Sequence, residues 1–547
     1  MEDILLYDTT LRDGTQGANI SFTSEEKLLI ARRLDDFGIH YIEGGWPGSN
    51  PRDMRFFELA KKTEFKQARL TSFAATRRPG ISPQDDQSIQ ALIESETPAV
   101  AIFGKSWDLH VEQALRTTLD ENLAMIRDSV EYLKSKGREV VYDAEQFFDG
   151  YKSNRHYALQ TLYAAVDGGA DFIVLCDTNG GSLPHEIDLI TGDVHNKLEE
   201  KLEREGKAPV KLGIHTHNDC GLAVANSIAA IQAGAMMVQG TINGYGERTG
   251  NADLTSIIPI LCLKMNRQCV PAESLAGLTD LARFVSETAN MTPLNSRPFV
   301  GKNAFAHKAG VHVNAVMKVT KSYEHMDPEL VGNRRRVLVS DLSGKSNIEF
   351  KAKEFGVEME SKDFDSRELV SEIKRLEQEG YQFDMAEGSF RLLMERLTEE
   401  FKPLFELESF RITVEKDKDE PCSAHAILKV RVRGNKEVTA ADGAEPVSVI
   451  DKALRKALSK YFPGLETMKP VDFNIRMLNG REGRPLRARV LIETRDQDHS
   501  WSTMGVSENI IEASWIALAD SFQYKLSKEI RERAGEESEM AAGATNT

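Results

Sequence analysis

Charged and polar side chains gather in one stretch near the start of the chain, YDTTLRDGTQGANISFTSEEK, directly after an apolar run. Asp8, Arg12, Asp13 and Gln16 all lie within this stretch. Adjacent opposite charges usually form an ion pair that fixes a loop. The same two side chains suit catalysis, with Asp13 binding a metal ion and Arg12 pointing its guanidinium at an oxyanion on a substrate. The adjacency of Arg12 and Asp13 alone does not distinguish a structural ion pair from a catalytic pair.

The run HTHND, residues 215–219, ends an apolar segment and presents two histidines. Because alternate residues of a strand point to the same side, His215 and His217 can bind one cation. Together with the carboxylate of Asp13 they make a site that keeps positions open for water or a chelating substrate. A chance pair on a polar strand end is the alternative, and the neighbouring Asn and Asp favour the metal site.

Further candidates follow other apolar runs. Glu145, which ends EVVYDAE, suits a general base, a metal ligand, an orienting group or a structural salt bridge. The glycine-rich run NGYGERTGN, 243–251, suits an anion site or a plain turn, since glycines let backbone N–H groups approach a ligand. His307 and His312 are candidate acid–base groups near neutral pH, although a single histidine is usually structural.

These residues need elements that bring them together. Apolar runs alternate with stretches of helical period such as 24–38, which the capping sequence SFTSEEK (21–27) starts and Gly38 ends. The predicted strands are residues 4–8, 39–44, 69–75, 99–104, 139–145, 172–178, 211–217 and 236–242. Eight βα units in about 260 residues predict a TIM barrel, whose strand ends carry the active site. A doubly wound open sheet is the alternative, but no G-x-G-x-x-G loop follows the first strand.

The composition and the predicted secondary structure of the chain change twice after the barrel. Charged helical stretches come first, and then a predicted β-β-β-α unit occurs twice, about 60 residues apart, which indicates two halves of one α+β domain. The predicted domains are a TIM-barrel catalytic domain at 1–270, helical linker subdomains at 271–403, a C-terminal regulatory domain at 404–530 and a disordered tail at 531–547.

The composition excludes several classes of protein. A formal charge of −16 argues against nucleic acid or an anionic membrane as the main partner. Five scattered cysteines form no disulfide framework, which favours a reducing cytoplasm. The start, MEDILLYDTT, does not resemble a targeting leader, and no apolar run of about 18 residues predicts a membrane span.

Taken together, DTTLRDGTQ, HTHND and NGYGERTGN resemble, in order and spacing, the signature of the metal-dependent acyl-CoA Claisen enzymes. That family includes the 2-isopropylmalate, homocitrate and citramalate synthases. The repeated β-β-β-α unit is similar to the regulatory domain of its isopropylmalate and citramalate members, so the resemblance covers nearly the whole chain. Within the family, YIEGGWPGSNP and DAEQFFDGY resemble the citramalate synthase group.

The resemblance implies a role for individual residues. It implies that the metal ligands are Asp13, His215, His217 and Asn251, that the catalytic residues are Arg12, Glu145, His312 and Tyr323, and that the substrate-binding residues are Arg12, Gln16, Glu43 and Thr178. The implied cofactor is one divalent ion, Mn²⁺, Mg²⁺, Co²⁺ or Zn²⁺. The implied assembly is a homodimer, with isoleucine as feedback effector.

The implied reaction is the condensation of acetyl-CoA with pyruvate, followed by hydrolysis to (R)-citramalate and CoA, which would supply isoleucine biosynthesis through 2-oxobutanoate. Three alternatives remain. The same chemistry on 2-oxoisovalerate would give isopropylmalate, and one methylene in an apolar pocket is worth only about 1 to 3 kcal/mol, so the sequence discriminates poorly between these substrates. A metal-dependent lyase or aldolase would cleave a C–C bond with the same residues. A small-molecule sensor would have an incomplete metal set.

Overall fold

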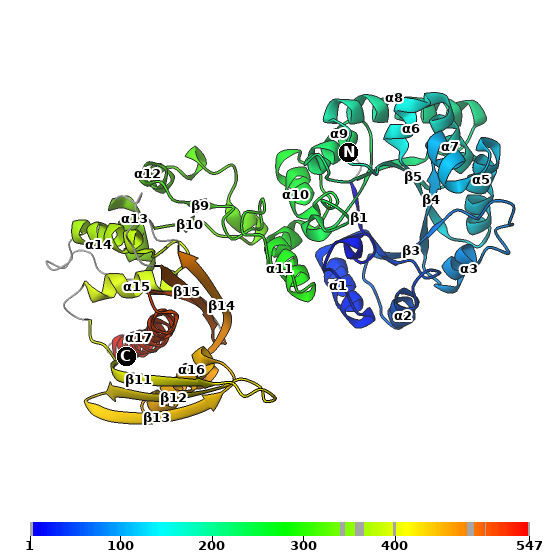
Figure 1. The fold of residues 1–547 in the computed structure, drawn as a ribbon. Helices are drawn as coiled ribbons and strands as arrows, with labels where there is room; N and C mark the ends of the chain where they lie inside the picture. Colours follow the sequence, from blue (N-terminus) through cyan, green and yellow to red (C-terminus); the bar gives the residue numbers. More distant parts are fainter. Residues whose placement is uncertain are drawn as a thin grey trace. The chain divides into compact units, whose positions relative to one another are not determined.

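The computed structural model describes residues 4–339, 345–355, 366–397, 401–478, 486–497 and 499–544. The chain divides into two compact units. Unit 1 comprises Met1–Phe305 and Met326–Arg334, and unit 2 comprises Ala306–His325 and Arg335–Thr547. In Figure 1 the chain colours run from blue to green through unit 1 and from green to red through unit 2.

A closed barrel of parallel strands forms unit 1 (Figure 1). β1 pairs with both β2 and β8, which closes the ring. The strands are β1 (Leu5–Asp8), β2 (Tyr41–Gly45), β3 (Arg69–Ala75), β4 (Ala99–Lys105), β5 (Glu139–Glu145), β6 (Phe172–Asp177), β7 (Lys211–Thr216) and β8 (Met237–Gly240). The predicted TIM barrel is therefore confirmed, with each strand close to its predicted bounds.

Helices alternate with the strands. They are α1 (Ser24–Phe37), α2 (Pro51–Ala60), α3 (Gln87–Glu94), α4 (Asp108–His110), α5 (Leu119–Ser135), α6 (Phe147–Ser153), α7 (Arg155–Gly168), α8 (Pro184–Glu205), α9 (Ala223–Gln232) and α10 (Leu254–Pro259). The capping prediction for the first helix is confirmed: the Thr23 side chain accepts from the Glu26 N–H, and the Glu26 side chain accepts from the Thr23 N–H. Gly38 ends α1 with φ of 108°, a conformation that favours glycine.

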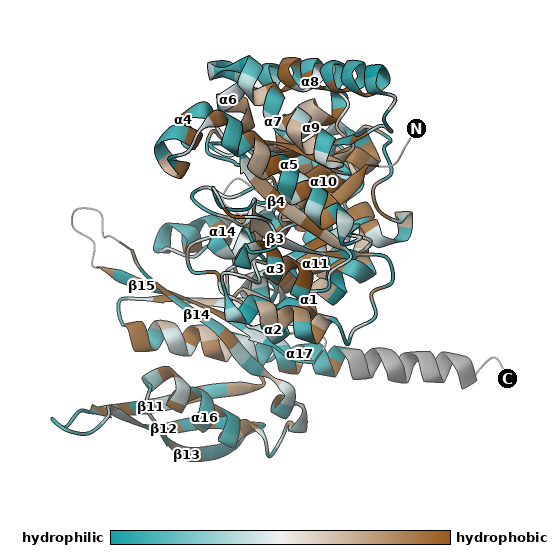
Figure 2. Cartoon of the chain, turned by 90° about the vertical axis from the view of Figure 1, so that its right-hand side faces the viewer, coloured by the Kyte–Doolittle hydropathy of each residue, from teal (hydrophilic) through white to brown (hydrophobic). Residues whose placement is uncertain are grey.

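The barrel strands are buried on both faces. In β4, Val100 and Ile102 join the apolar layer under the helices, whereas Ala99 and Ala101 face the barrel interior with Tyr7, Phe73 and Val174. This explains why the strands appear in the sequence as continuous apolar runs. Figure 2 shows both brown and teal residues along α8, as expected for a helix that buries one side.

Unit 1 continues past residue 270, where the sequence placed the end of the barrel domain. Helix α11 (Leu278–Thr288) carries Leu278, Leu281 and Val285 at helical spacing, and all three are buried in the barrel's main apolar cluster. The apolar face of α11 therefore attaches this segment to the barrel.

Unit 2 contains the remaining elements. These are β9 (Ala306–His307), α12 (Gly310–Lys318), β10 (Arg336–Val337), α13 (Lys345–Phe355), α14 (Ser366–Glu379), α15 (Glu387–Arg396), β11 (Phe405–Glu415), β12 (Ser423–Val432), β13 (Asn435–Gly443), α16 (Pro446–Leu458), β14 (Lys469–Leu478), β15 (Arg487–Arg495), β16 (Ser500–Ser507) and α17 (Ile510–Ala544). Strands β11–β13 and β14–β16 form two antiparallel sheets, each followed by a helix. The predicted pair of β-β-β-α units is confirmed.

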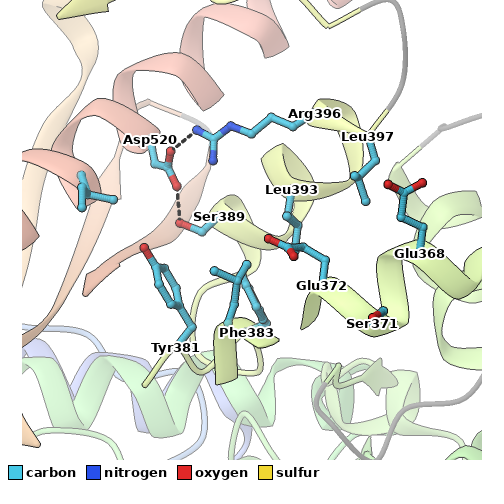
Figure 3. A pocket seen from close by; sticks show the side chains of 12 residues that line it. Glu368, Ser371, Glu372, Tyr381, Phe383, Ser389, Leu393, Arg396, Leu397 and Asp520 are labelled. Carbon is cyan, nitrogen blue, oxygen red and sulfur yellow. Dashed lines mark hydrogen bonds and ion pairs between the residues drawn. The ribbon is translucent and has the colours of Figure 1, made fainter. Parts of the chain in front are cut away.

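Side chains from helices far apart in the sequence join within unit 2. Asp520 of α17 is buried and accepts hydrogen bonds from Ser389 Oγ at 2.7 Å and Arg396 Nη2 at 2.5 Å, both on α15 (Figure 3). They line a cavity of about 510 Å³, together with Leu376 of α14 and Ile516 of α17. Helix α15, predicted as part of the linker, therefore packs with the C-terminal elements.

The last helix is longer than predicted. The sequence analysis placed a disordered tail at 531–547, but α17 extends to Ala544, and residues 545–547 lie outside the described residues. The segment EIRERAGEESEMAAGA is rich in Ala, Glu, Arg and Met, which are strong helix formers, and this composition explains the difference. In the described part of the chain, no helix combines the length and the apolar composition needed to cross a bilayer.

Candidate active site and metal centre

Three side chains at the carboxyl ends of the barrel strands present one ligand atom each to a common point. Asp13, His215 and His217 are buried, and their ligand atoms all lie within 4.8 Å of one another. The Nε2 atoms of the two histidines are 3.2 Å apart, and Asp13 Oδ2 lies 3.4 Å from the first and 4.0 Å from the second. Two imidazole nitrogens and one carboxylate oxygen in this arrangement suit a divalent ion.

Asn251 completes this cluster from the glycine-rich loop. It forms an isolated antiparallel bridge with His217, and its Nδ2 donates to the Tyr245 carbonyl at 3.1 Å. Its Oδ1 is buried and has no hydrogen-bond partner among the described residues. Gly246, with φ of 153°, passes so close that a Cβ there would lie 2.2 Å from Asn251 Nδ2. The residues present therefore fit a cation with one further oxygen ligand.

Local charges hold the cluster in the protonation states that a cation requires. Burial opposes ionisation of Asp13, but Arg12 and the two histidines outweigh it and lower the Asp13 pKa. Burial, with His215 beside it, lowers the pKa of His217 to about 4. At neutral pH Asp13 is therefore an anion and His217 is neutral, as metal ligands must be.

Hydrogen bonds from inside the barrel fix the orientation of His215. Its Nδ1 lies 2.8 Å from Gln239 Oε1, and Gln239 Nε2 donates to Asp143 Oδ1 at 2.9 Å. The amide oxygen can only accept, so the Nδ1 of His215 carries the proton and its Nε2 is left as the ligand atom. Burial, and then the charge of Glu43, raises the pKa of Asp143 to about 8.

Arg12 is held on three sides. Its Nε donates to Glu43 Oε2 at 2.5 Å, its Nη1 lies 3.4 Å from Asp13 Oδ2, and its Cζ lies 3.8 Å from the centre of the Phe73 ring. Glu43 is fully buried and also accepts from Tyr7 Oη at 2.6 Å and Thr9 Oγ1 at 2.5 Å. The guanidinium is therefore fixed beside the metal cluster with its charge retained.

Comparisons with known proteins cover almost the whole chain. Residues 3–285 match the HMGL-like family, 299–381 match the homocitrate synthase post-HMGL domain-like family, and 384–526 match the LeuA allosteric (dimerisation) domain. The (R)-citramalate synthase of Aquifex aeolicus is 52% identical over 97% of this chain and 99% of its own. That of Geobacter sulfurreducens is 52% identical over 96% of this chain and 98% of its own. The chain belongs to the citramalate and 2-isopropylmalate synthase family.

Other members of the family are more distant. The 2-isopropylmalate synthase of Methanocaldococcus jannaschii is 31% identical over 96% of this chain and 95% of its own. Among solved structures, the HMG-CoA lyase of Bacillus subtilis is 19% identical, covers 54% of this chain and 97% of its own, and aligns with a TM-score of 0.44. The HMGL-like enzymes are metal-dependent, in agreement with the cluster at Asp13.

Other residues implied by the family resemblance lie around the same barrel mouth. Glu145 ends β5 and forms an ion pair with Lys105, which ends β4. Thr178 follows β6, and its Oγ1 accepts from the Gln146 N–H at 2.9 Å. Gln16 is exposed at the end of the turn after Asp13. Their roles in the reaction stay predictions.

Two predicted catalytic residues lie in unit 2. His312 is on α12, Tyr323 follows it, and their rings stack with centroids 4.3 Å apart. Both side chains are exposed. His307, the other candidate acid–base histidine, instead contacts buried Glu324 at 3.1 Å, which is a structural contact within unit 2. The proton-transfer role of His312 stays a prediction.

The residues that orient the ligands are not among those predicted from the sequence. Gln239 is the single polar residue of the run MMVQG, and Asp143 is the one charged residue inside the stretch VVYDA. An isolated polar side chain on a strand that is buried on both faces needs a partner, and that was the available signal.

Replacing Gln239 with leucine is expected to lower the affinity for Mn²⁺ by about 10- to 100-fold, because His215 loses the acceptor that fixes its tautomer. Isothermal titration of the metal-free protein measures this affinity. Gln239→Glu keeps an acceptor oxygen and should retain more of the affinity than the leucine variant. Equal affinity of the leucine variant and the unmodified protein would contradict the positioning role.

Proposed function

We propose that the protein condenses acetyl-CoA with pyruvate and releases (R)-citramalate and CoA, a reaction that supplies isoleucine biosynthesis through 2-oxobutanoate in the cytoplasm. The observation that carries the proposal is identity of 45–52% with five (R)-citramalate synthases over at least 95% of this chain. The 2-isopropylmalate synthases of the same family are 31% identical.

The side chains beside Arg12 favour a small oxo acid. Phe73 and Phe103 stack with centroids 5.3 Å apart, and Trp46 packs edge-on against each of them at 5.7 Å. Trp46 directly follows β2, whereas Phe73 and Phe103 lie within β3 and β4 near their carboxyl ends, and the Phe73 ring contacts the guanidinium. Because these rings reduce the space beside Arg12, we expect the methyl group of pyruvate to fit there better than the isopropyl group of 2-oxoisovalerate.

Asp13, His215 and His217 would hold the metal ion, with Asn251 as a further ligand. A bound divalent ion, whether Mn²⁺, Mg²⁺, Co²⁺ or Zn²⁺, supplies Lewis-acid polarisation of the keto group of the oxo acid.

Arg12 stabilises the negative charge that develops on the keto oxygen when the acetyl carbon attacks. Its guanidinium is fixed by Glu43 and Phe73 before the reaction, so little reorganisation is needed as the charge forms. Glu43 thus acts on the substrate through Arg12, since its own oxygens already accept from Tyr7, Thr9 and Arg12.

Thr178 positions the substrate carboxylate. Its oxygen accepts from the Gln146 N–H, so its hydroxyl hydrogen can be donated to the oxo acid. Glu145 lies at the same mouth, paired with Lys105, and Gln16 borders it from the first loop. His312, on which Tyr323 stacks, is proposed to assist proton transfer.

The proposal includes a homodimer formed through the C-terminal domain. The edge strand β14 exposes Phe473, Ile475 and Met477 at alternate positions, which form one apolar row on one side of the strand. Light scattering is expected to give a dimer for the unmodified protein and a smaller species for Ile475→Asp. Asn474→Asp, on the opposite side of the same strand, is the matched control and should stay dimeric. A dimeric Ile475→Asp protein would place the interface elsewhere.

The match of residues 384–526 to an allosteric domain supports binding of a small effector, and isoleucine, the end product of the proposed route, is the proposed one. Isothermal titration with isoleucine, with leucine as the comparison, measures this directly. Preferential binding of leucine would contradict the assignment.

The reaction itself is tested by product analysis. The protein with Mn²⁺, acetyl-CoA and pyruvate is expected to yield citramalate and free CoA in equal amounts, and chiral chromatography should identify the R enantiomer. CoA release without citramalate would indicate simple thioester hydrolysis and would refute the proposal.

A further inference from the structure

Two cysteines of unit 1 lie side by side after the last barrel helix. Cys262 belongs to the helical turn η4 (Ile260–Lys264), and Cys269 follows seven residues later. Their Sγ atoms are 3.4 Å apart, and neither forms a disulfide in this structure. A disulfide bond is about 2.05 Å long, so a small rotation of the side chains would bring the sulfurs to bonding distance.

The surroundings of Cys262 favour its thiolate. Its sulfur interacts with the Cys269 thiol and accepts from the backbone N–H groups of Cys269 and Val270. These hydrogen bonds outweigh burial and lower the pKa of Cys262 to about 7. Cys262 is half-buried, whereas Cys269 is buried. One sulfur is thus a reachable nucleophile, and the second is shielded directly behind it.

The remaining cysteines differ from this pair. Cys176 is buried in the barrel interior, where burial raises its pKa well above the usual range. Cys220 and Cys422 are exposed to solvent. The oxidation rate of exposed Cys422 is therefore the internal reference for the rate at which the pair reacts.

The pair lies at the end of the barrel opposite the metal cluster. The carbonyl of Gln268 accepts from the Ile4 N–H at 3.3 Å, just before β1 begins, whereas Asp13 follows the end of β1. This face of a TIM barrel carries stability rather than chemistry. A bond between Cys262 and Cys269 would fix the segment that leads from α10 to the base of β1 without touching Arg12 or the metal ligands.

We propose that Cys262 and Cys269 form an oxidant-reactive dithiol that closes to a disulfide when the protein meets a hydroperoxide. The Cys262 thiolate attacks the distal peroxide oxygen, the O–O bond breaks, and an alcohol or water leaves after protonation, which gives a sulfenic acid on Cys262. The Cys269 thiol then attacks that sulfur and its proton leaves with the hydroxyl as water. The two thiols lose two electrons in total, and the peroxide gains them.

The test uses the full-length protein, hydrogen peroxide, alkylation of residual thiols and tryptic digestion. Lys264 and Arg267 separate the two cysteines, so a disulfide links two peptides, 249–264 and 268–283, which mass spectrometry detects and which separate on reduction. The linked pair is expected to form about tenfold faster than Cys422 is oxidised, because hydrogen bonds to the Cys262 sulfur favour its thiolate and the Cys269 sulfur lies 3.4 Å away. The oxidised protein should melt a few degrees higher, with unchanged turnover.

Cys262→Ser should abolish the link. Cys269→Ser should instead leave a sulfenic acid on Cys262 that dimedone captures. Cys220→Ser is the control and should behave like the unmodified protein. The proposal is overturned if peroxide oxidises Cys422 before any linked pair appears, or if the link forms only after the protein is unfolded in urea.

Discussion

Replacing Arg12 with lysine is expected to lower kcat by about 10²- to 10³-fold, the loss seen when one donor to a developing oxyanion is removed. Lysine keeps the positive charge but loses the planar guanidinium, which bonds Glu43 through Nε while it stacks on Phe73. The KM for pyruvate should change much less, because the interaction is strongest in the transition state. Steady-state assays of CoA release give both parameters.

The matched control for this variant is Arg55→Lys, since Arg55 is exposed on α2 and forms an ion pair with Glu58 at 3.4 Å. It should retain normal kinetics. Circular dichroism should show both variants folded, because Glu43 keeps its bonds from Tyr7 and Thr9. If the kcat of Arg12→Lys stays within a factor of about three of that of the unmodified protein, Arg12 does not stabilise the oxyanion.

Replacing His217 with alanine is expected to abolish turnover and to weaken Mn²⁺ binding by more than the roughly 10- to 100-fold predicted for loss of a supporting hydrogen bond. His217 contributes a nitrogen to a cluster whose ligand atoms lie within 4.8 Å of one another. Removing it leaves one imidazole nitrogen, one carboxylate and the amide oxygen of Asn251, so the site loses one of its two nitrogen ligands. Titration of the metal-free protein measures the affinity independently of activity.

The control histidine is His195 on α8, which is partly exposed and lies 3.4 Å from Glu199. His195→Ala should bind Mn²⁺ with unchanged affinity. The His217→Ala protein should keep its barrel, since the apolar interior formed by Tyr7, Val141 and Val174 lies below the cluster. Undiminished Mn²⁺ binding by His217→Ala would place the metal elsewhere.

The barrel was predictable because its strands are buried on both faces. A run such as FIVLC in β6 leaves few alternatives, and the strand ends then identify Asp13, His215 and His217 as neighbours although they are about 200 residues apart in sequence. The helix signals were equally local, as the capping box at Thr23 and the glycine at position 38 show.

Features that depend on tertiary packing were not predictable in the same way. Gln239 and Asp143 can orient His215 only because β5, β7 and β8 bring the three side chains together in the folded barrel. The attachment of α11 to the barrel and the bonds from α15 to Asp520 both rest on contacts between segments that are distant in sequence. The length of α17 is a local property, because the segment after residue 530 is rich in residues with high helix propensity.

The most direct test of the account compares two oxo acids in parallel. CoA release from acetyl-CoA is measured with Mn²⁺ and either pyruvate or 2-oxoisovalerate. The rings of Trp46, Phe73 and Phe103 beside Arg12 predict a higher kcat/KM for pyruvate, by at least about tenfold for a difference of two methyl groups. A higher kcat/KM for 2-oxoisovalerate would contradict the assignment to citramalate formation.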